Sequence, residues 1–146
     1  MDSLSDFFQR WREKRDSSPN EIPSYSEILT KNGQLLAYGF NSVEQNLNPL
    51  KHSEIVAIES ALKLLNEKYL TDCILVTALE PCVLCAGAII RVRIPEVMYF
   101  LPAKPGEGIS SYSTDSIYLL NHFPKCQLIP KSEIKLEFLT FFKEKR

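Results

Sequence analysis

Two short motifs constrain this chain more than any other feature of its sequence. Residues 52–54 read His-Ser-Glu, and residues 81–85 read Pro-Cys-Val-Leu-Cys. Together they offer one imidazole and two thiols, which are typical zinc ligands, and one carboxylate beyond these three groups. A structural zinc site is usually closed by four protein ligands, whereas three ligands leave a position where the pKa of water falls to about 7. The two motifs therefore predict a catalytic zinc site.

Both motifs fall near the start of a predicted helix. Apolar residues recur at helical spacing after the first motif and predict a helix over about 52–68. The proline of the second motif favours a helix start, and Cys82 and Cys85 share one face of that helix. Two helix N-termini would then meet at the metal, where their positive ends favour thiolates. We expect one zinc ion per chain, bound by His52, Cys82 and Cys85. Glu54 supplies the carboxylate that remains beyond these three ligands.

Two other roles for the cysteines remain open at this point. A Cys-x-x-Cys pair can form a redox dithiol, although such a pair needs neither His52 nor Glu54. A closed structural zinc site needs a fourth ligand, and the candidates of the right chemistry are Cys73, His122 and Cys126. Both of these cysteines begin short apolar runs and are expected in the core, whereas the histidine follows a short helical segment and is expected at the surface. The open site is therefore the preferred interpretation.

Several stretches around the two motifs match one known family. They are Gly-Phe-Asn at 39–41, His-Ser-Glu-Ile at 52–55 and Leu-Glu-Pro-Cys-Val-Leu-Cys-Ala-Gly-Ala-Ile-Ile at 79–90, with weaker matches at 21–23, 95–100 and 141–143. On these residues the chain resembles the tRNA adenosine deaminases, a branch of the cytidine-deaminase-like family. The paired motifs are also the general signature of zinc nucleobase deaminases. The resemblance implies a single zinc-dependent deaminase domain over residues 1–146.

The resemblance also implies an activity. It is the hydrolytic conversion of adenosine to inosine at the wobble position of a tRNA anticodon loop, a form of RNA editing in tRNA processing. Glu54 would move protons between water and the purine, while zinc activates the water. Asn41 stands at the family's base-contacting position, and Ser53 falls near the base pocket. We therefore expect Asn41 and Ser53 to bind the substrate.

The order of the predicted elements indicates the fold class. Helices are expected up to about Lys14, over 52–68, from Pro81, near 115–121 and from Ser132. Strands are expected at about 25–29, 35–40, 73–79, 97–101 and 127–129. Asn32-Gly33 between the first two strands is a strong hairpin signal. We expect an α/β fold, a three-layer α/β/α sandwich with a central mixed five-stranded sheet of the cytidine-deaminase-like kind.

The chain departs from the family pattern near the expected base pocket. Ser53 replaces the usual alanine, and residues 23–26 read Pro-Ser-Tyr-Ser where a Pro-Val-Gly-Ala run is usual. Residues 102–109 read Pro-Ala-Lys-Pro-Gly-Glu-Gly-Ile in place of the family's Asp-x-Lys-x-Gly-Ala loop. The RNA contacts of that loop are therefore not carried over to this chain.

Composition indicates a compact enzyme without a disulfide framework. The chain has 146 residues, 45% of them hydrophobic, and four cysteines, two of which are committed to the metal. With no secretion signal and no apolar run near the ~20 residues of a membrane span, a cytoplasmic protein is expected. The net charge of -1 is not that of a strong RNA binder. We therefore expect tRNA contacts from local groups, namely Arg91, Arg93 and residues 143–146, pooled by a homodimer.

Three functions remain open on the sequence. The first is an RNA-editing deaminase acting on a tRNA wobble adenosine. The second is a deaminase of a free base or nucleoside, such as guanine, cytosine or cytidine, which the altered 102–109 loop and the weak basic charge favour. The third is a catalytically silent zinc-binding partner subunit, and Glu54 argues against it because an inert subunit does not need an acid/base.

Overall fold

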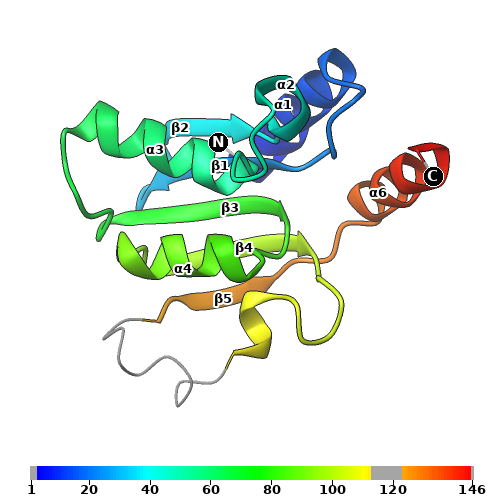
Figure 1. Cartoon of the computed structure of the whole chain (residues 1–146). Coiled ribbons are helices and arrows are strands. Elements are labelled where there is room, and N and C mark those ends of the chain that lie inside the picture. The colour runs from blue at the N-terminus through cyan, green and yellow to red at the C-terminus, as the bar shows by residue number, and fades with distance from the viewer. Residues whose placement is uncertain (1–2, 113–122, 146) are drawn as a thin grey trace.

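A mixed five-stranded sheet forms the centre of the protein (Figure 1). The computed structural model describes residues 3–112 and 123–145. The strands are β1 (Tyr25–Thr30), β2 (Leu35–Phe40), β3 (Cys73–Leu79), β4 (Glu96–Leu101) and β5 (Lys125–Leu128). Their order is β2-β1-β3-β4-β5, with β1 antiparallel to β2 and β3, and with β3, β4 and β5 parallel. The expected mixed sheet is confirmed.

Helices cover both faces of the sheet, so the expected three-layer sandwich is confirmed. The helices are α1 (Ser3–Ser17), α2 (Val43–Asn46), α3 (Ser53–Leu65), α4 (Val83–Arg91) and α6 (Ser132–Lys145). In Figure 1, α3 and α4 lie in front of the sheet, and the cores show that α1 and α6 pack on the other face. Side chains alternate along β3, because Leu75 packs with α3 and α4, whereas Val76 packs with α1 and α6. Burial on both faces explains why this strand is a continuous apolar run.

The hairpin between β1 and β2 forms where Asn32-Gly33 predicted it. The Gly33 N–H donates to the Thr30 carbonyl at 2.9 Å, and Gly33 has a φ of 86°. Glycine adopts this left-handed conformation without strain. The Thr30 N–H donates to the Gln34 carbonyl at 2.8 Å, so the connection is longer than a two-residue turn. Helix α3 packs against both strands of this hairpin.

A glycine in β2 lets α3 approach the sheet closely. An added Cβ at Gly39 would lie 2.5 Å from the Ser53 carbonyl oxygen and 2.7 Å from the Ala57 nitrogen. No larger residue fits there without moving the backbone of α3. The first turn of α3 is thereby fixed against β2, and His52, directly before it, is fixed with it.

Some element boundaries differ from those predicted. Helix α1 continues to Ser17 rather than ending near Lys14, and α3 ends at Leu65 because Asn66 adopts a left-handed cap with a φ of 52°. Two short elements were not predicted, α2 and a 3-10 turn over Ile109–Ser111. The helix predicted near 115–121 lies outside the described residues. Within residues 3–112 and 123–145, no helix has the length and apolar character needed to cross a membrane.

Candidate active site

The two predicted metal motifs meet where α3 and α4 begin. His52 is the residue before α3, and Cys82 is the residue before α4, with Cys85 in the first turn of α4. The helix after the second motif therefore starts at Val83, two residues after the predicted proline. Both helices start near the same end of the central strands, as Figure 1 shows. This arrangement confirms that two helix N-termini converge on the site.

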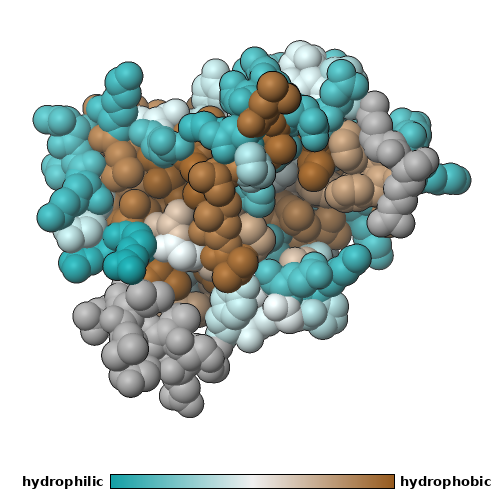
Figure 2. Space-filling view, in the orientation of Figure 1, coloured by the Kyte–Doolittle hydropathy of each residue, from teal (hydrophilic) through white to brown (hydrophobic). Residues whose placement is uncertain are grey.

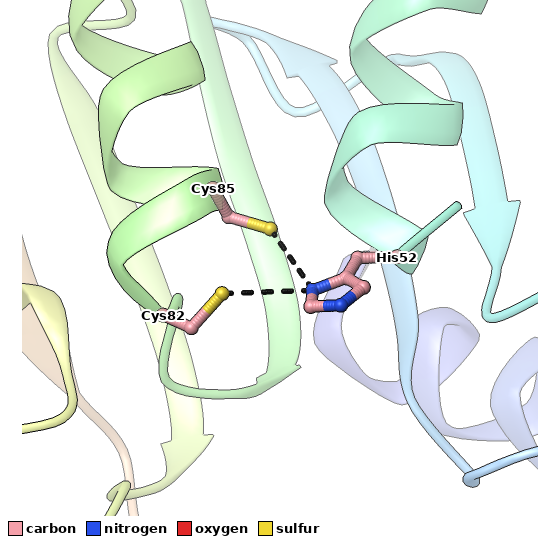
Figure 3. A group of neighbouring side chains, drawn as sticks. All are labelled: His52, Cys82 and Cys85. Atoms are coloured by element: carbon pink, nitrogen blue, oxygen red, sulfur yellow. Dashed lines mark hydrogen bonds between the residues drawn. The ribbon is translucent and has the colours of Figure 1, made fainter. Parts of the chain in front are cut away.

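The three predicted ligands have the spacing of a tetrahedral metal site. His52 Nδ1 lies 3.5 Å from the sulfurs of both Cys82 and Cys85 (Figure 3). A zinc ion with bonds of ~2.05 Å to nitrogen and ~2.3 Å to sulfur would set these atoms about 3.6 Å apart. All three ligand atoms lie within 4.8 Å of one another. The donor set and its spacing therefore fit one zinc ion.

The two site thiols ionise as a pair. The hydrogen bond with Cys85, assisted by His52, lowers the pKa of Cys82 to about 3. The same hydrogen bond and burial raise the pKa of Cys85. Without a cation the pair therefore keeps one proton, because two neighbouring negative charges are unfavourable. A divalent cation removes this conflict, so the electrostatics of the site also fit a metal.

The alternative ligands are not part of this cluster. Cys73 is 3% exposed and belongs to the core under α3 and α4, and the partly buried Cys126 packs against the same core. These positions confirm that both are core residues. His122 lies outside the described residues. In the part of the chain that the structure describes, His52, Cys82 and Cys85 form the one group of potential ligands close enough to share a metal.

Glu54 is buried beside the three predicted ligands and is not part of the group of side chains that could share a metal. It is 5% exposed, and its Oε1 accepts hydrogen bonds from Ser53 Oγ at 2.5 Å and Ser26 Oγ at 3.2 Å. Thr77 Oγ1 is a third, longer donor at 3.4 Å. Ser53 is 0% exposed, so its hydroxyl contacts the carboxylate from the protein interior. The site therefore holds a carboxylate in a fixed orientation next to the metal position.

Asn41 is held by a second buried carboxylate. Its Nδ2 donates to Glu21 Oε1 at 3.2 Å, and Glu21 also accepts from the backbone N–H groups of Glu44 at 3.0 Å and Gln45 at 2.7 Å. Asn41 is 6% exposed, and Glu21 is 5% exposed. Glu21 thus joins the entry of β1, the end of β2 and the start of α2. The Asn41 amide has a set orientation as a result.

A cavity of about 850 Å³ opens beside His52 and Asn41. Its lining residues are Asn20, Ile22, Asn41, Val43, Glu44, Pro49, His52, Phe141 and Phe142. The two phenylalanines come from α6 and pack edge to face, with ring centroids 5.4 Å apart. The end of the chain therefore forms one wall of the cavity. The exposed Lys143 follows these rings on α6.

Two of the cations expected beside the substrate are elsewhere. Arg91 ends α4 and Arg93 follows it, whereas the ligands stand at the start of this nine-residue helix. A helix of that length separates its ends by about 13 Å. Arg93 instead stacks on Tyr69, with its guanidinium carbon 4.3 Å from the ring centroid. The expectation that these arginines flank the pocket is wrong, because the helix runs away from the metal.

The divergent 102–109 loop is tied to the second metal motif. The buried Glu80 carboxylate accepts from the Ala103 N–H at 3.1 Å and from the Ser110 N–H and hydroxyl at 2.8 and 2.6 Å. The Ile109 N–H donates to the Pro81 carbonyl at 2.9 Å. The residues of this loop do not line the cavity beside His52. The loop is therefore fixed beside α4 and leaves that cavity uncovered.

Sequence reasoning did not assign a role to several residues that build the site. Glu21 stands in a stretch that matches the family, but its hydrogen bond to Asn41 depends on the pairing of β1 with β2. Ser26 and Thr77 reach Glu54 from neighbouring strands, and no local pattern connects them. The one signal in the sequence was the unusual 23–26 stretch, which the structure places beside Ser53.

Comparison with known proteins agrees with this site. Residues 4–101 match the family described as the cytidine and deoxycytidylate deaminase zinc-binding region. The chain is 35% identical over 134 residues to the tRNA-specific adenosine deaminase of Aquifex aeolicus, covering 91% of this chain and 88% of that one. It is 40% identical over 94 residues to the guanine deaminase of Bacillus subtilis, covering 64% of this chain and 60% of the other.

A solved tRNA:A34 deaminase has the same fold. It superposes with a TM-score of 0.74 at 23% identity, over 86% of this chain and 98% of the other. The expected cytidine-deaminase-like architecture is therefore confirmed. With the ligand geometry, the adjoining buried carboxylate and the family match in agreement, the chain belongs to the cytidine and deoxycytidylate deaminase zinc-binding family and is a zinc-dependent deaminase.

Proposed function

We propose that this chain converts adenosine to inosine at the wobble position of a tRNA anticodon loop. The observation that carries the proposal is the position of the buried Glu54, beside three side chains that could bind one metal ion. Three protein ligands leave room for water, and a carboxylate outside the ligand set is free to move protons. The adenosine substrate follows from the 35% identity to the Aquifex aeolicus tRNA-specific adenosine deaminase over most of both chains.

The reaction replaces the exocyclic amine of adenine with oxygen. A bond forms between C6 and the oxygen of water, the C6–N bond breaks, and ammonia leaves. A zinc ion bound by His52, Cys82 and Cys85 would make water nucleophilic near neutral pH. Glu54 takes a proton from the water and places it on N1, and it then moves the second water proton to the amine. This transfer is needed because an amine is a poor leaving group until it is protonated.

The cavity lined by His52 and Asn41 would hold the adenine outside its RNA stack. Asn41 would orient the purine through its amide, which Glu21 holds in place. Phe141 and Phe142 supply an aromatic wall to the same cavity, and unstacked RNA bases bind well to aromatic rings. Ser53 was expected at the base; because its hydroxyl is buried and donates to Glu54, we assign it a role through that carboxylate.

We propose one zinc ion per chain, with no fourth protein ligand, in a single deaminase domain. Because both site thiols must stay reduced to bind metal, a reducing compartment such as the cytoplasm suits this enzyme. Metal analysis of the purified protein should give a zinc-to-chain ratio near one. Anomalous scattering that revealed a fourth side chain on the metal would instead indicate a structural site.

We also propose that the chain works as a homodimer through the face of α3 and α4. Figure 2 shows apolar residues gathered on this face, and Val83 is 69% exposed there. Gly87 lies in the middle of α4, where glycine destabilises a helix by roughly 1 kcal/mol relative to alanine. An added Cβ at Gly87 would meet nothing within 4 Å. No contact among the described residues explains this glycine, whereas close approach of a second chain does.

A charge at Gly87 tests the dimer. Gly87→Arg should fold and bind zinc, because the site is open in the single chain, but it should change the mass in light scattering from dimer to monomer. Glu96→Arg, which places an arginine at an exposed position on β4, is the matched control and should remain dimeric. A monomeric wild type, or a dimeric Gly87→Arg variant, would refute the proposal.

A free-base deaminase is the second candidate. It is favoured by the 40% identity to the Bacillus subtilis guanine deaminase, although that match spans 94 residues and about 60% of the relative. An RNA substrate needs an uncovered cavity mouth and gains affinity from phosphate contacts, whereas a free base is enclosed. The position of the 102–109 loop, away from the lining of the cavity, supports the RNA substrate.

A substrate panel separates the two candidates. Zinc-loaded protein should form inosine in an anticodon stem-loop with a wobble adenosine, and it should not act on free guanine, cytosine, adenosine or cytidine. Binding of the stem-loop should weaken as salt rises, because phosphate contacts release counterions, whereas turnover of a neutral base is nearly indifferent to salt. Activity on free bases alone, with a flat salt response, would identify the second candidate.

A further inference from the structure

Three serines form a hydrogen-bonded group beside Glu54. Ser24 directly precedes β1, Ser26 lies near the start of β1, and Ser53 is the first residue of α3. Ser53 Oγ lies 2.9 Å from Ser24 Oγ and 2.7 Å from Ser26 Oγ. Ser26 Oγ lies 2.7 Å from Thr77 Oγ1 on β3. The four hydroxyls therefore form one connected cluster, which ends on the Glu54 carboxylate.

The cluster is closed to solvent. Ser26, Ser53 and Thr77 are each 0% exposed, and Ser24 is 7% exposed. Every buried side-chain nitrogen or oxygen in the described part of the protein has a hydrogen-bond partner. Because the cluster is closed to solvent, a hydroxyl that is removed from it leaves its neighbours without that partner. The four groups depend on one another for their hydrogen bonds.

The number of hydrogens in the cluster limits the directions of its hydrogen bonds. Each hydroxyl donates one hydrogen and accepts two, whereas an ionised carboxylate only accepts. The 2.5 Å contact assigns the hydrogen of Ser53 to Glu54 Oε1. Its two lone pairs are then left for the hydroxyls of Ser24 and Ser26. Ser26 has one hydrogen, which is directed either to Ser53 at 2.7 Å or to Glu54 itself at 3.2 Å. In both arrangements the hydrogens point toward the carboxylate, and Ser53 connects Ser24 to it.

We propose that this hydroxyl cluster is a positioning device for Glu54, with Ser53 as its central residue. It holds the carboxylate in the orientation that proton transfer requires. Hydrogen bonds to charged groups are stronger than neutral ones, and linked donors strengthen one another in a buried site. The proposal rests on the proposed function, because it assigns Glu54 the proton transfers of the deamination. Ser53 acts through Glu54 and does not touch the base.

The cluster makes a prediction that a simple packing role does not. A partly satisfied buried polar network is worse than none, whereas replacing all partners with apolar groups is nearly neutral. Ser53→Ala alone leaves Ser24 without its Ser53 acceptor and Glu54 without its shortest hydrogen bond. The triple variant Ser24→Val, Ser26→Ala, Ser53→Ala removes the three serines together. It should therefore recover stability that the single variant loses, but kcat should stay low because Glu54 still lacks the donors that orient it.

Kinetics on the wobble stem-loop test the device. Ser53→Ala should keep its zinc and its KM within about twofold, while its Tm falls and kcat falls by about 10- to 100-fold, the equivalent of one charged hydrogen bond. The triple variant should recover Tm but not kcat. Ser60→Ala, an exposed serine on the same helix, is the control and should match wild type.

The outcomes for the serine variants test the cluster separately from the proposed function. An unchanged kcat in a folded Ser53→Ala variant overturns the proposal, and so does a triple variant with the kcat of the wild type. If Ser53→Ala does not fold, Ser24→Ala removes one donor at the edge of the cluster and should lower kcat a few-fold at constant KM. No change in that variant also overturns it. An inactive wild type, or a fully active Glu54→Gln variant, would refute the proposed function instead.

Discussion

Glu21 is expected to control catalysis without touching the substrate. Its carboxylate accepts hydrogen bonds from the Asn41 side chain at 3.2 Å and from two backbone N–H groups, at 3.0 and 2.7 Å, at the start of α2. Glu21→Ala removes all three acceptors at once. The Asn41 amide then loses the group that sets its orientation toward the purine.

The size of the effect follows from these contacts. Glu44 and Gln45 are exposed residues, so water replaces their lost partner, and the free energy of unfolding should change little. Asn41 is 6% exposed, so its amide has few other partners. A hydrogen bond to a charged group contributes about 1.5–3 kcal/mol, and losing it should lower kcat/KM by about 10- to 100-fold.

A double-mutant cycle tests the coupling between the two residues. If Glu21 acts through Asn41, then Glu21→Ala should lower kcat/KM little further in a protein that already carries Asn41→Ala. Glu59→Ala removes an exposed carboxylate on α3 and is the control, with no expected change. Independent, multiplicative losses in the double variant would refute the reasoning, as would full activity in Glu21→Ala.

Three further changes have distinct expected outcomes. Glu54→Gln should keep zinc but lower kcat by about 10²–10⁴-fold, the usual contribution of an acid/base, and near-normal turnover would contradict its role. His52→Ala should lose the metal itself, as measured by metal analysis, and chelation of the wild type should lower Tm and expose Cys82 to a thiol reagent. Arg12 lowers the pKa of Glu133, and this pair stabilises the fold above the ordinary carboxyl pKa, an effect that is lost as the pH falls through the lowered value. Arg12→Ala should therefore reduce the urea midpoint at neutral pH but match wild type in strong acid, and a difference that persists in acid would contradict this account.

The metal site was predictable because its information is local. His52, Glu54, Cys82 and Cys85 are ordered by helix geometry within two short motifs, and their residue types specify the metal. Apolar periodicity gave the first of the two helices, Pro81 indicated the start of the second, and a continuous apolar run gave the strand between them. These predictions needed only spacing along the chain, which the sequence records directly.

The supports of the site were not predictable in the same way. Ser26 meets Ser53 because β1 packs beneath α3, and Glu21 meets Asn41 because β1 pairs with β2. Such contacts depend on strand register and on the close approach that Gly39 permits. The arginine error had a similar cause, because proximity in sequence to a metal motif says nothing about the direction in which the helix leaves it.

Mass spectrometry of the reaction in ¹⁸O-labelled water tests the central claim most directly. The substrate is an anticodon stem-loop with its wobble adenosine, and zinc-loaded wild type is compared with Glu54→Gln. Hydrolytic deamination predicts inosine at the wobble position that carries one labelled oxygen, formed by the wild type and nearly absent with the variant. An unchanged wobble adenosine, together with conversion of free guanine or cytosine, would contradict the account.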